Sequence, residues 1–262
     1  MTNTAIQIKN LSLRLSGKTI LRKVSLEINR GEYISIIGPN GAGKTSLVKC
    51  ISRIYSNWSG TVQINGKDIG QFSQRELARQ LSYVPQAEGR TLPFTVFEFV
   101  LMGRYPHLSP FTSIGADDKK IVFETLEKAG LIPFSDRRLN TLSGGERQMV
   151  FIAAALAQGA DILLLDEPTS FLDYSHQAQV MQLLSRLHRE NNITIISVSH
   201  DINAACAQST GIMALKEGEF QFFEPPEIAM DTDRLEALYD TPFLIAAHPS
   251  GNGRIALAEG RT

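Results

Sequence analysis

The sequence predicts an α/β fold with parallel strands at its centre, and two observations favour this class. Three apolar runs suited to buried strands occur at residues 32–37 (EYISII), 161–166 (DILLLD) and 193–198 (ITIISV), with helical patterns between them. Strands that alternate with helices predict parallel pairing. In addition, a glycine-rich turn at 38–45 joins the first of these strands to a helical pattern, which is typical of a nucleotide-binding α/β protein.

Length and charge agree with an ordinary globular protein. The chain has 262 residues, and its 26 Lys and Arg nearly balance its 27 Asp and Glu. This balance gives no general electrostatic reason to bind nucleic acid, so we expect no nucleic-acid partner. The N-terminus lacks the apolar segment of a signal peptide, and no stretch approaches the roughly 18 apolar residues of a membrane span. We therefore expect the chain to be made and kept in the cytoplasm.

The N-terminal region follows a different pattern from the predicted core. Residues 6–16, 24–28 and 61–69 form short alternating runs, and Asn65 and Gly66 mark a turn in the last of them. These runs predict an antiparallel sheet packed beside the core.

The middle of the chain predicts an inserted helical subdomain. Residues 116–131 place Ile121, Val122, Thr125, Leu126 and Ala129 on one face, with acidic residues at the start and Gly130 at the end. We assign 1–86 and 161–225 to the core with its antiparallel sheet, 87–160 to the helical subdomain, and 226–262 to a tail that packs on the core. Within the tail, residues 231–241 predict a short helix with Leu235 and Leu238 facing inward.

Residues 38–45 (GPNGAGKT) match the phosphate-loop pattern GxxxxGK[ST] in full. Glycines let backbone N–H groups surround the β-phosphate, Lys44 bridges the β- and γ-phosphates, and Thr45 ligates Mg²⁺. A chance match is disfavoured because a strand precedes the turn and a helical pattern follows it. The residues assigned to ATP are Gly38, Pro39, Asn40, Gly41, Ala42, Gly43, Lys44, Thr45 and Ser46.

Two adjacent carboxylates end the apolar run at 161–166. Ligands bind at the carboxyl ends of parallel strands, so Asp166 is placed to face Mg²⁺ and Glu167 to act as general base toward water. The alternative, in which Asp166 only caps the following turn, is the weaker one beside a complete phosphate loop.

Two further motifs accompany the phosphate loop and the acidic pair: LSGGE (142–146) lies between them, and SVSHD (197–201) follows the acidic pair. With the four motifs in this order, the chain resembles an ATP-binding-cassette (ABC) nucleotide-binding subunit over residues 6–225. The resemblance implies a P-loop NTPase core of the RecA-like type. It also implies that Gln86 binds Mg²⁺ and water, and that His200 contacts the γ-phosphate. A lone histidine after a strand is more often a surface or capping residue, but its place after 193–198 favours the functional role. Ser170, Leu172 and Asp173 resemble the D-loop that crosses a dimer.

The resemblance also accounts for a second glycine turn in one small chain. It implies that two copies pair head to tail, so that Ser143, Gly144, Gly145 and Glu146 of one copy close on the ATP held by the other. The residues support this, because a helical face follows the glycines directly and puts them at a helix N-terminus. That face consists of Met149, Ile152, Ala153, Leu156 and Ala157.

Two positions depart from the family pattern. Leu15 stands where most members have an aromatic residue that stacks on adenine. Loss of that contact, worth about 1–3 kcal/mol by analogy with base stacking, predicts weak discrimination between ATP and GTP. Glu146 stands where many members have Gln, and its carboxylate would repel phosphate. We expect Glu146 to point away from the phosphate and to pair with Arg147 or another arginine.

Residues 95–108 (TVFEFVLMGRYPHL) resemble the importer ATPases for metal chelates, namely iron–siderophore complexes, haem and cobalamin. This resemblance implies an ATP hydrolase that uses ATP and Mg²⁺, with Lys44, Glu167 and His200 as catalytic residues. It implies integral-membrane permease subunits as partners, a substrate-binding protein as an indirect partner, and a peripheral location at the cytoplasmic face of the cell membrane. The alternative is a soluble ABC ATPase without cargo, such as an iron–sulfur cluster assembly component, which would keep the same motifs.

Overall fold

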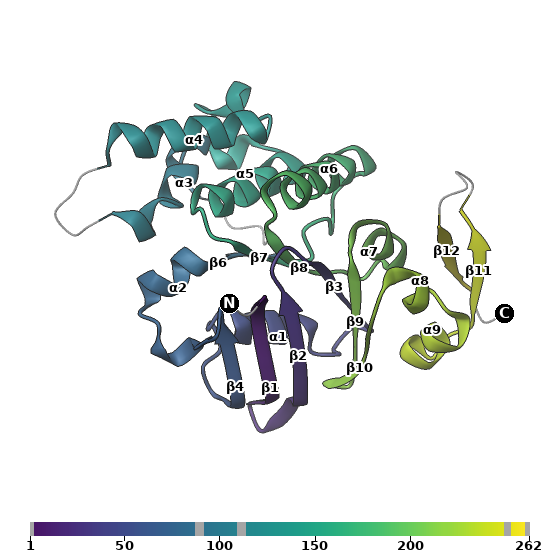
Figure 1. Cartoon of the computed structure of the whole chain (residues 1–262). Coiled ribbons are helices and arrows are strands. Elements are labelled where there is room, and N and C mark those ends of the chain that lie inside the picture. Colours follow the sequence, from purple (N-terminus) through teal and green to yellow (C-terminus); the bar gives the residue numbers. More distant parts are fainter. Residues whose placement is uncertain (1–2, 87–91, 109–113, 249–252, 260–262) are drawn as a thin grey trace. The chain divides into compact units, whose positions relative to one another are not determined.

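The computed structural model describes residues 3–86, 92–108, 114–248 and 253–259. The chain divides into two compact units, shown in Figure 1. The first unit joins Met1–Ile69 to Asn192–Thr262, and the second is Gly70–Asn191. Each unit combines strands with helices, so the predicted α/β class is confirmed.

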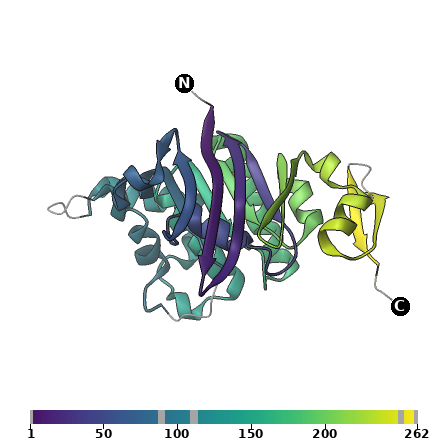
Figure 2. The same ribbon diagram turned by 90° about the horizontal axis from the view of Figure 1, so that it is seen from below.

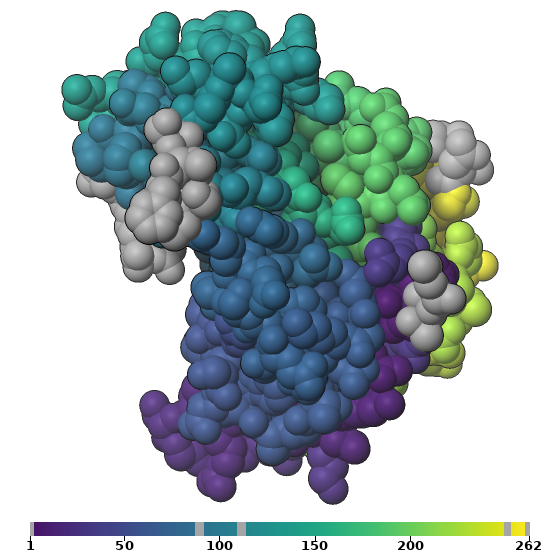
Figure 3. All heavy atoms as spheres, turned by 60° about the vertical axis from the view of Figure 1, so that its left-hand side comes forward, coloured from purple at the N-terminus to yellow at the C-terminus, as the bar shows by residue number. Residues whose placement is uncertain are grey.

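An antiparallel sheet opens the first unit, as the alternating runs predict. Its strand order is β2-β1-β4-β5, and Figure 2 shows β1 and β2 side by side. The strands are β1 (Thr4–Leu15), β2 (Lys18–Asn29), β4 (Trp58–Ile64) and β5 (Lys67–Asp68). Ile6, Ile8, Leu11 and Leu13 of β1 are fully buried, whereas Lys9 and Arg14 are exposed. Purple side chains of this sheet lie on the surface shown in Figure 3.

A second group of strands carries the predicted parallel core of the first unit. In the order β10-β9-β3-β8, β3 runs parallel to both β8 and β9, and β10 is antiparallel to β9. Every residue of β3 and β8 is buried, as expected for strands covered on both faces. The strands are β3 (Tyr33–Ile37), β8 (Thr194–Val198), β9 (Gly211–Lys216) and β10 (Glu219–Glu224), and the helices that follow β3 and β8 are α1 (Lys44–Ile51) and α7 (Ile202–Gln208).

The C-terminal part of the first unit contains two short helices and a hairpin, drawn in yellow-green and yellow in Figures 1 and 2. They are α8 (Pro226–Ala229), α9 (Thr232–Tyr239), β11 (Phe243–Ala247) and β12 (Arg254–Ala258). Leu235 and Leu238 are buried, which confirms the predicted inward face. The hairpin was not predicted from the sequence.

Helices dominate the second unit, which also holds the parallel strand pair β6 (Leu81–Val84) and β7 (Ile162–Asp166). Its helices are α2 (Gln74–Gln80), α3 (Val96–Met102), α4 (Ala116–Lys128), α5 (Gly144–Ala157) and α6 (Tyr174–Asn191), with 3₁₀ turns at Ile69–Gln71, Tyr105–His107, Ile132–Phe134 and Leu139–Thr141. This unit is wider than the predicted subdomain 87–160, whose residues 87–91 lie outside the described part of the chain. The strands group with the helices because Ser82 Oγ donates to Ala155 O (3.0 Å) and Gln158 Nε2 to Leu81 O (2.8 Å).

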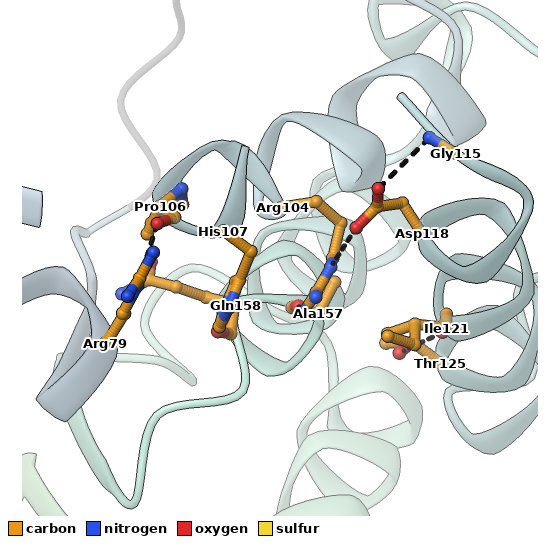
Figure 4. Close-up of polar contacts among 10 residues, drawn as sticks. All are labelled: Arg79, Arg104, Pro106, His107, Gly115, Asp118, Ile121, Thr125, Ala157 and Gln158. Carbon is orange, nitrogen blue, oxygen red and sulfur yellow. Dashed lines mark hydrogen bonds and ion pairs between the residues drawn. The ribbon is translucent and has the colours of Figure 1, made fainter. Parts of the chain in front are cut away.

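Polar contacts fix the turn that follows α3, as Figure 4 shows. The buried Arg104 side chain donates to Asp118 Oδ1 at the start of α4 (3.1 Å) and to Ala157 O at the end of α5 (2.8 Å). The His107 ring lies 2.8 Å from Gln158 O, and Arg79 of α2 donates to Pro106 O (2.9 Å). The turn is therefore attached to three helices.

The Arg104–Asp118 pair leads to a pH-dependent prediction. The hydrogen bond from Arg104 lowers the pKa of Asp118, and the Gly115 backbone N–H adds to this effect. A depressed carboxyl pKa stabilises the fold above the unfolded value near 4, and that stability is lost as the pH falls through the folded value. We expect Asp118→Asn to lower the free energy of unfolding by about 1–2 kcal/mol at pH 7, with the difference from wild type shrinking below about pH 4.

Urea unfolding at several pH values measures this difference. The control is Glu124→Gln on the same helix, because Glu124 forms an exposed i,i+4 pair with Lys120 (3.9 Å) and should change the unfolding free energy by at most about 0.5 kcal/mol. An Asp118→Asn protein as stable as wild type at pH 7 would refute the assigned role of the pair.

Candidate functional site

The glycine loop at 38–43 follows β3 and adopts a backbone that favours glycine at three positions, at two of which a Cβ would also clash. Gly38, Gly41 and Gly43 all have positive φ, of 141°, 80° and 97°. A Cβ on Gly38 would lie 2.0 Å from Leu215 O, and one on Gly43 would lie 2.8 Å from Leu21 Cδ2. The loop is therefore packed directly against β9 and β2, and its shape is fixed by its surroundings.

Helix α1 begins at the end of this loop without a side-chain cap. Its N-cap residue is Gly43, which has no side chain that could cap the first turn. The Lys44 side chain is buried, and its ammonium donates to Gly38 O (2.7 Å) and Pro39 O (3.0 Å). A helix N-terminus without a cap, beside a buried ammonium, suits a phosphate group. Around it, Ala42 is buried, Pro39, Thr45 and Ser46 are half-buried, and Asn40 and Gly41 are exposed.

His200 lies at the same edge of the parallel strands as the loop. Ile36 of β3 pairs with Val198 of β8, and the Ser199 backbone N–H donates to Ile36 O (3.0 Å). His200 therefore follows β8 at the level where Gly38 follows β3, and it is exposed there. Both residues belong to the first unit, as does Leu15, which ends β1 half-buried and pairs with Lys18.

The predicted glutamine and general base meet in the second unit. β6 and β7 are parallel, and Gln86 Nε2 donates to Glu167 Oε2 (3.1 Å) just beyond their paired ends. Ser170 Oγ donates to the same oxygen (2.8 Å). Glu167 has a φ of 50°, which is uncommon outside glycine. The structure thus brings Gln86, Glu167 and Ser170 together.

Asp166 lies beside them, with a partner that sequence reasoning missed. Its carboxylate is 3% exposed, and its Oδ2 accepts a hydrogen bond from the Tyr83 hydroxyl (3.1 Å). Tyr83 lies on β6, three residues before Gln86. The pairing of β6 with β7 places it beside Asp166, and no sequence motif indicates this contact.

The donor set fits magnesium. Thr45 offers a hydroxyl, Asp166 a buried carboxylate and Gln86 an amide oxygen, which are the hard oxygen ligands that Mg²⁺ accepts. Thr45 belongs to the first unit, and the other two residues belong to the second.

The second glycine turn forms a capped helix start. Ser143 is the N-cap of α5, its hydroxyl accepts from the Glu146 backbone N–H (3.2 Å), and its own N–H donates to Glu146 Oε2 (2.7 Å). The donation from the Ser143 backbone lowers the pKa of Glu146. The sequence left open whether Glu146 pairs with Arg147 or with another arginine. In the structure the partner is Arg137, at 3.8 Å, and no ion pair joins Glu146 to Arg147 among the described residues.

The two glycines of this turn differ in their surroundings. A Cβ on Gly145 would lie 2.1 Å from the His176 ring, whereas a Cβ on Gly144 would meet no atom within 4 Å. Gly145 therefore packs inside the unit, and Gly144 faces open space.

Two exposed aromatic residues flank the predicted D-loop positions Leu172 and Asp173. Phe171 is 90% exposed and Tyr174 is 91% exposed. The Asp173 carboxylate accepts hydrogen bonds from the backbone (2.9 Å) and the ring (2.8 Å) of His176. Exposed aromatic side chains can mark an interaction surface, and their exposure beside the predicted D-loop positions was not predicted from the sequence.

Gln148 was also missed. Its side chain is 2% exposed, and its amide has no hydrogen-bond partner among the described residues. Its burial was not predicted because glutamine is a residue type that is mostly exposed.

Comparisons with known proteins cover the whole chain. A family model described as ABC transporter matches residues 21–170. The iron(3+)-hydroxamate import ATP-binding protein FhuC of Bacillus subtilis (strain 168) is 36% identical, over 97% of this chain and 94% of that protein. The ferric enterobactin transport ATP-binding protein FepC of Escherichia coli (strain K12) is 35% identical, over 100% and 97%.

Solved structures agree. An inward-facing metal-chelate type ABC transporter superposes with a TM-score of 0.86 at 25% identity, over 99% of this chain and 98% of that chain. The dimeric ATP-binding cassette MJ0796 bound to ADP and Pi gives a TM-score of 0.73 at 31% identity, over 84% and 98%. The family match spans more than half of the sequence, and the two relatives span nearly all of it. This chain belongs to the ABC transporter family.

Proposed function

We propose that this chain is the ATP-hydrolysing subunit of an importer for a metal chelate, with iron–siderophore complexes as the cargo class. The observation that carries the proposal is that relatives matched over nearly the whole chain are named for import of iron(3+)-hydroxamate and for transport of ferric enterobactin. Residues 95–108, which resemble those of metal-chelate importers, add support. The comparisons give no support to the alternative of an ABC ATPase without a transport partner.

In the proposed site, the loop 38–46 holds the phosphates, and Lys44 offsets charge that develops on them. Glu167, held by Gln86 and Ser170, accepts a proton from the attacking water, and His200 contacts the γ-phosphate. Thr45, Asp166 and Gln86 are the residues that would hold Mg²⁺, which would supply positive charge to the phosphate oxygens when bound. Leu15 replaces the adenine-stacking aromatic residue, so weak discrimination between ATP and GTP belongs to the proposal.

The partner in hydrolysis is a second copy of the chain. Ser143 and Gly144 lie exposed at the start of α5, which suits them to contact a phosphate held by another molecule. The exposed Phe171 and Tyr174 offer apolar surface beside the D-loop positions. The dimeric relative MJ0796 supports this arrangement.

The other partner is a permease, and the turn after α3 is the surface that we assign to it. Tyr105 is 68% exposed and Met102 is 45% exposed, on a turn that Arg104 and His107 attach to α5. Among the described residues, no helix combines the length and apolarity that a membrane crossing requires. We therefore propose a peripheral location at the cytoplasmic face of the membrane, bound through the permease, with a substrate-binding protein acting indirectly.

Replacement of the general base tests the site. We expect Glu167→Gln to lower the ATP hydrolysis rate by about 10²- to 10⁴-fold, with MgATP affinity retained because the phosphate loop is unchanged. Phosphate release and nucleotide binding are measured separately. Glu217→Gln is a matched control, because Glu217 is also an acidic residue with positive φ (51°) and is exposed in a turn. Wild-type turnover in Glu167→Gln would remove Glu167 from the mechanism.

Association with a permease tests the transport function. The chain is co-expressed with the permease of a siderophore importer, and the purified complex is assayed for ATP hydrolysis. We expect Tyr105→Glu to abolish membrane co-sedimentation and permease-dependent stimulation, while the isolated chain keeps its basal rate. Ile132→Glu places the same charge on another exposed apolar residue of the second unit and should have no effect. Co-sedimentation and stimulation that survive Tyr105→Glu would exclude this turn, and wild-type protein that never associates would contradict the transport assignment.

A further inference from the structure

The C-terminal segment, described over residues 226–248 and 253–258, packs against two parts of the first unit that adjoin the phosphate loop and His200. Its buried side chains Leu235, Leu238 and Ala256 share one hydrophobic cluster with Ile37, the last residue of β3, and with Ile202 of α7. Ile37 directly precedes Gly38, and Ile202 follows His200 by two residues. The segment thus lies behind both the loop and the histidine turn.

Asn203 joins this segment to α7 with a paired hydrogen bond. Its Nδ2 donates to Ala256 O (3.0 Å), and its Oδ1 accepts from the Ala256 backbone N–H (2.8 Å). The side-chain amide therefore pairs with β12 as a neighbouring strand would, which satisfies both backbone groups of one residue. Because two hydrogen bonds join the same two residues, they fix the orientation of the Asn203 side chain relative to β12 as well as its distance.

Asn203 lies in the first turn of α7, and His200 lies directly before the N-cap of that helix. Asp201 is the N-cap of α7, and its carboxylate accepts from the backbone N–H groups of Asn203 (2.9 Å) and Ala204 (3.1 Å). The Ser199 hydroxyl accepts from the Asp201 N–H (3.1 Å). Movement of Asn203 would therefore be passed through the cap to the residue before it, the exposed His200.

The other end of the segment reaches the loop. Lys216 of β9 donates to Ala237 O (2.6 Å) and to Asp240 Oδ1 (2.7 Å), which holds the end of α9 against the strand. The Tyr239 hydroxyl, at this end, is buried and has no hydrogen-bond partner of ordinary geometry among the described residues. Burial raises the pKa of Tyr239 to about 12, and the nearby Gly38 backbone N–H partly offsets this rise.

We propose that the C-terminal hairpin is a positioning element of the ATPase site, and that Asn203 is the positioning residue through which it holds the His200 turn. This inference rests on the role of His200 in the proposed function. It assigns a task to a segment for which the sequence indicated packing only.

The test compares steady-state ATP hydrolysis and MgATP binding for Asn203→Ala, His200→Ala and the double variant. We expect Asn203→Ala to lower kcat by about 10- to 100-fold, since displacement of a reacting group by about 1 Å has an effect of this size. KM and the dissociation constant of MgATP should stay within about twofold, because ground-state binding belongs to the loop. In the double variant, kcat should equal that of His200→Ala, because a positioning residue has no effect once its target is absent.

Two further variants make the test specific. Gln221→Ala removes an exposed amide from β10 of the same unit and should leave all constants unchanged. Asn203→Asp keeps the size of the side chain but places an oxygen against Ala256 O. It should therefore lower kcat as Asn203→Ala does. It replaces Asn203→Ala in the test if the alanine variant does not fold. Hydrogen exchange of the Ala256 amide should accelerate in Asn203→Ala, which removes its acceptor.

The outcomes separate this inference from the proposed function. Wild-type kcat in both Asn203 variants, or a loss of kcat that is equally large with and without His200, would overturn the positioning role. If His200→Ala alone hydrolyses ATP at the wild-type rate, the role of His200 in the proposed function fails, and positioning through it fails with it.

Discussion

The first unit depends on the N-terminus of α1, which no N-cap side chain closes. Helices α2, α3, α5, α7 and α9 each begin at a Ser, Thr or Asp whose side chain accepts a backbone hydrogen bond. Helix α1 begins at Gly43 instead, which offers no capping side chain. The close approach of Leu215 O to Gly38 and of Leu21 to Gly43 holds the loop in the required shape. An anion is the group that completes such an end.

The second glycine turn solves a different physical problem. Helix α5 is capped by its own Ser143, and the carboxylate of Glu146 is tied to the Ser143 N–H and lies near Arg137. Its negative charge is thus partly offset within the molecule, which explains how a glutamate is accommodated where a phosphate is expected to approach. Gly144 remains open while Gly145 packs on His176. The turn offers backbone and hydroxyl groups outward, as a site that serves another molecule requires.

The parts of the structure that were predictable are those with short-range signals. The runs at 32–37, 161–166 and 193–198 became β3, β7 and β8 within one residue, because short continuous apolar runs favour buried strands. The contacts of Tyr83 with Asp166 and of Asn203 with Ala256 join residues 83 and 53 positions apart, and no local pattern encodes them. The hairpin β11–β12 was missed although its contacts are local, since it pairs Phe243 with Ala258 and Ala247 with Arg254. Residue types identified the chemistry, but only the fold shows what supports it.

The central claim is that the turn at 142–146 completes the ATP site of a second copy. Light scattering of the hydrolysis-impaired Glu167→Gln protein, with and without MgATP, measures this directly when Ser143→Arg is added as the control. We expect a monomer without nucleotide, a dimer with MgATP, and a monomer under both conditions once Ser143 is replaced. Two results would contradict the role of the turn at 142–146. One is a dimer that forms regardless of Ser143, and the other is a protein that binds MgATP but stays monomeric both alone and with its permease.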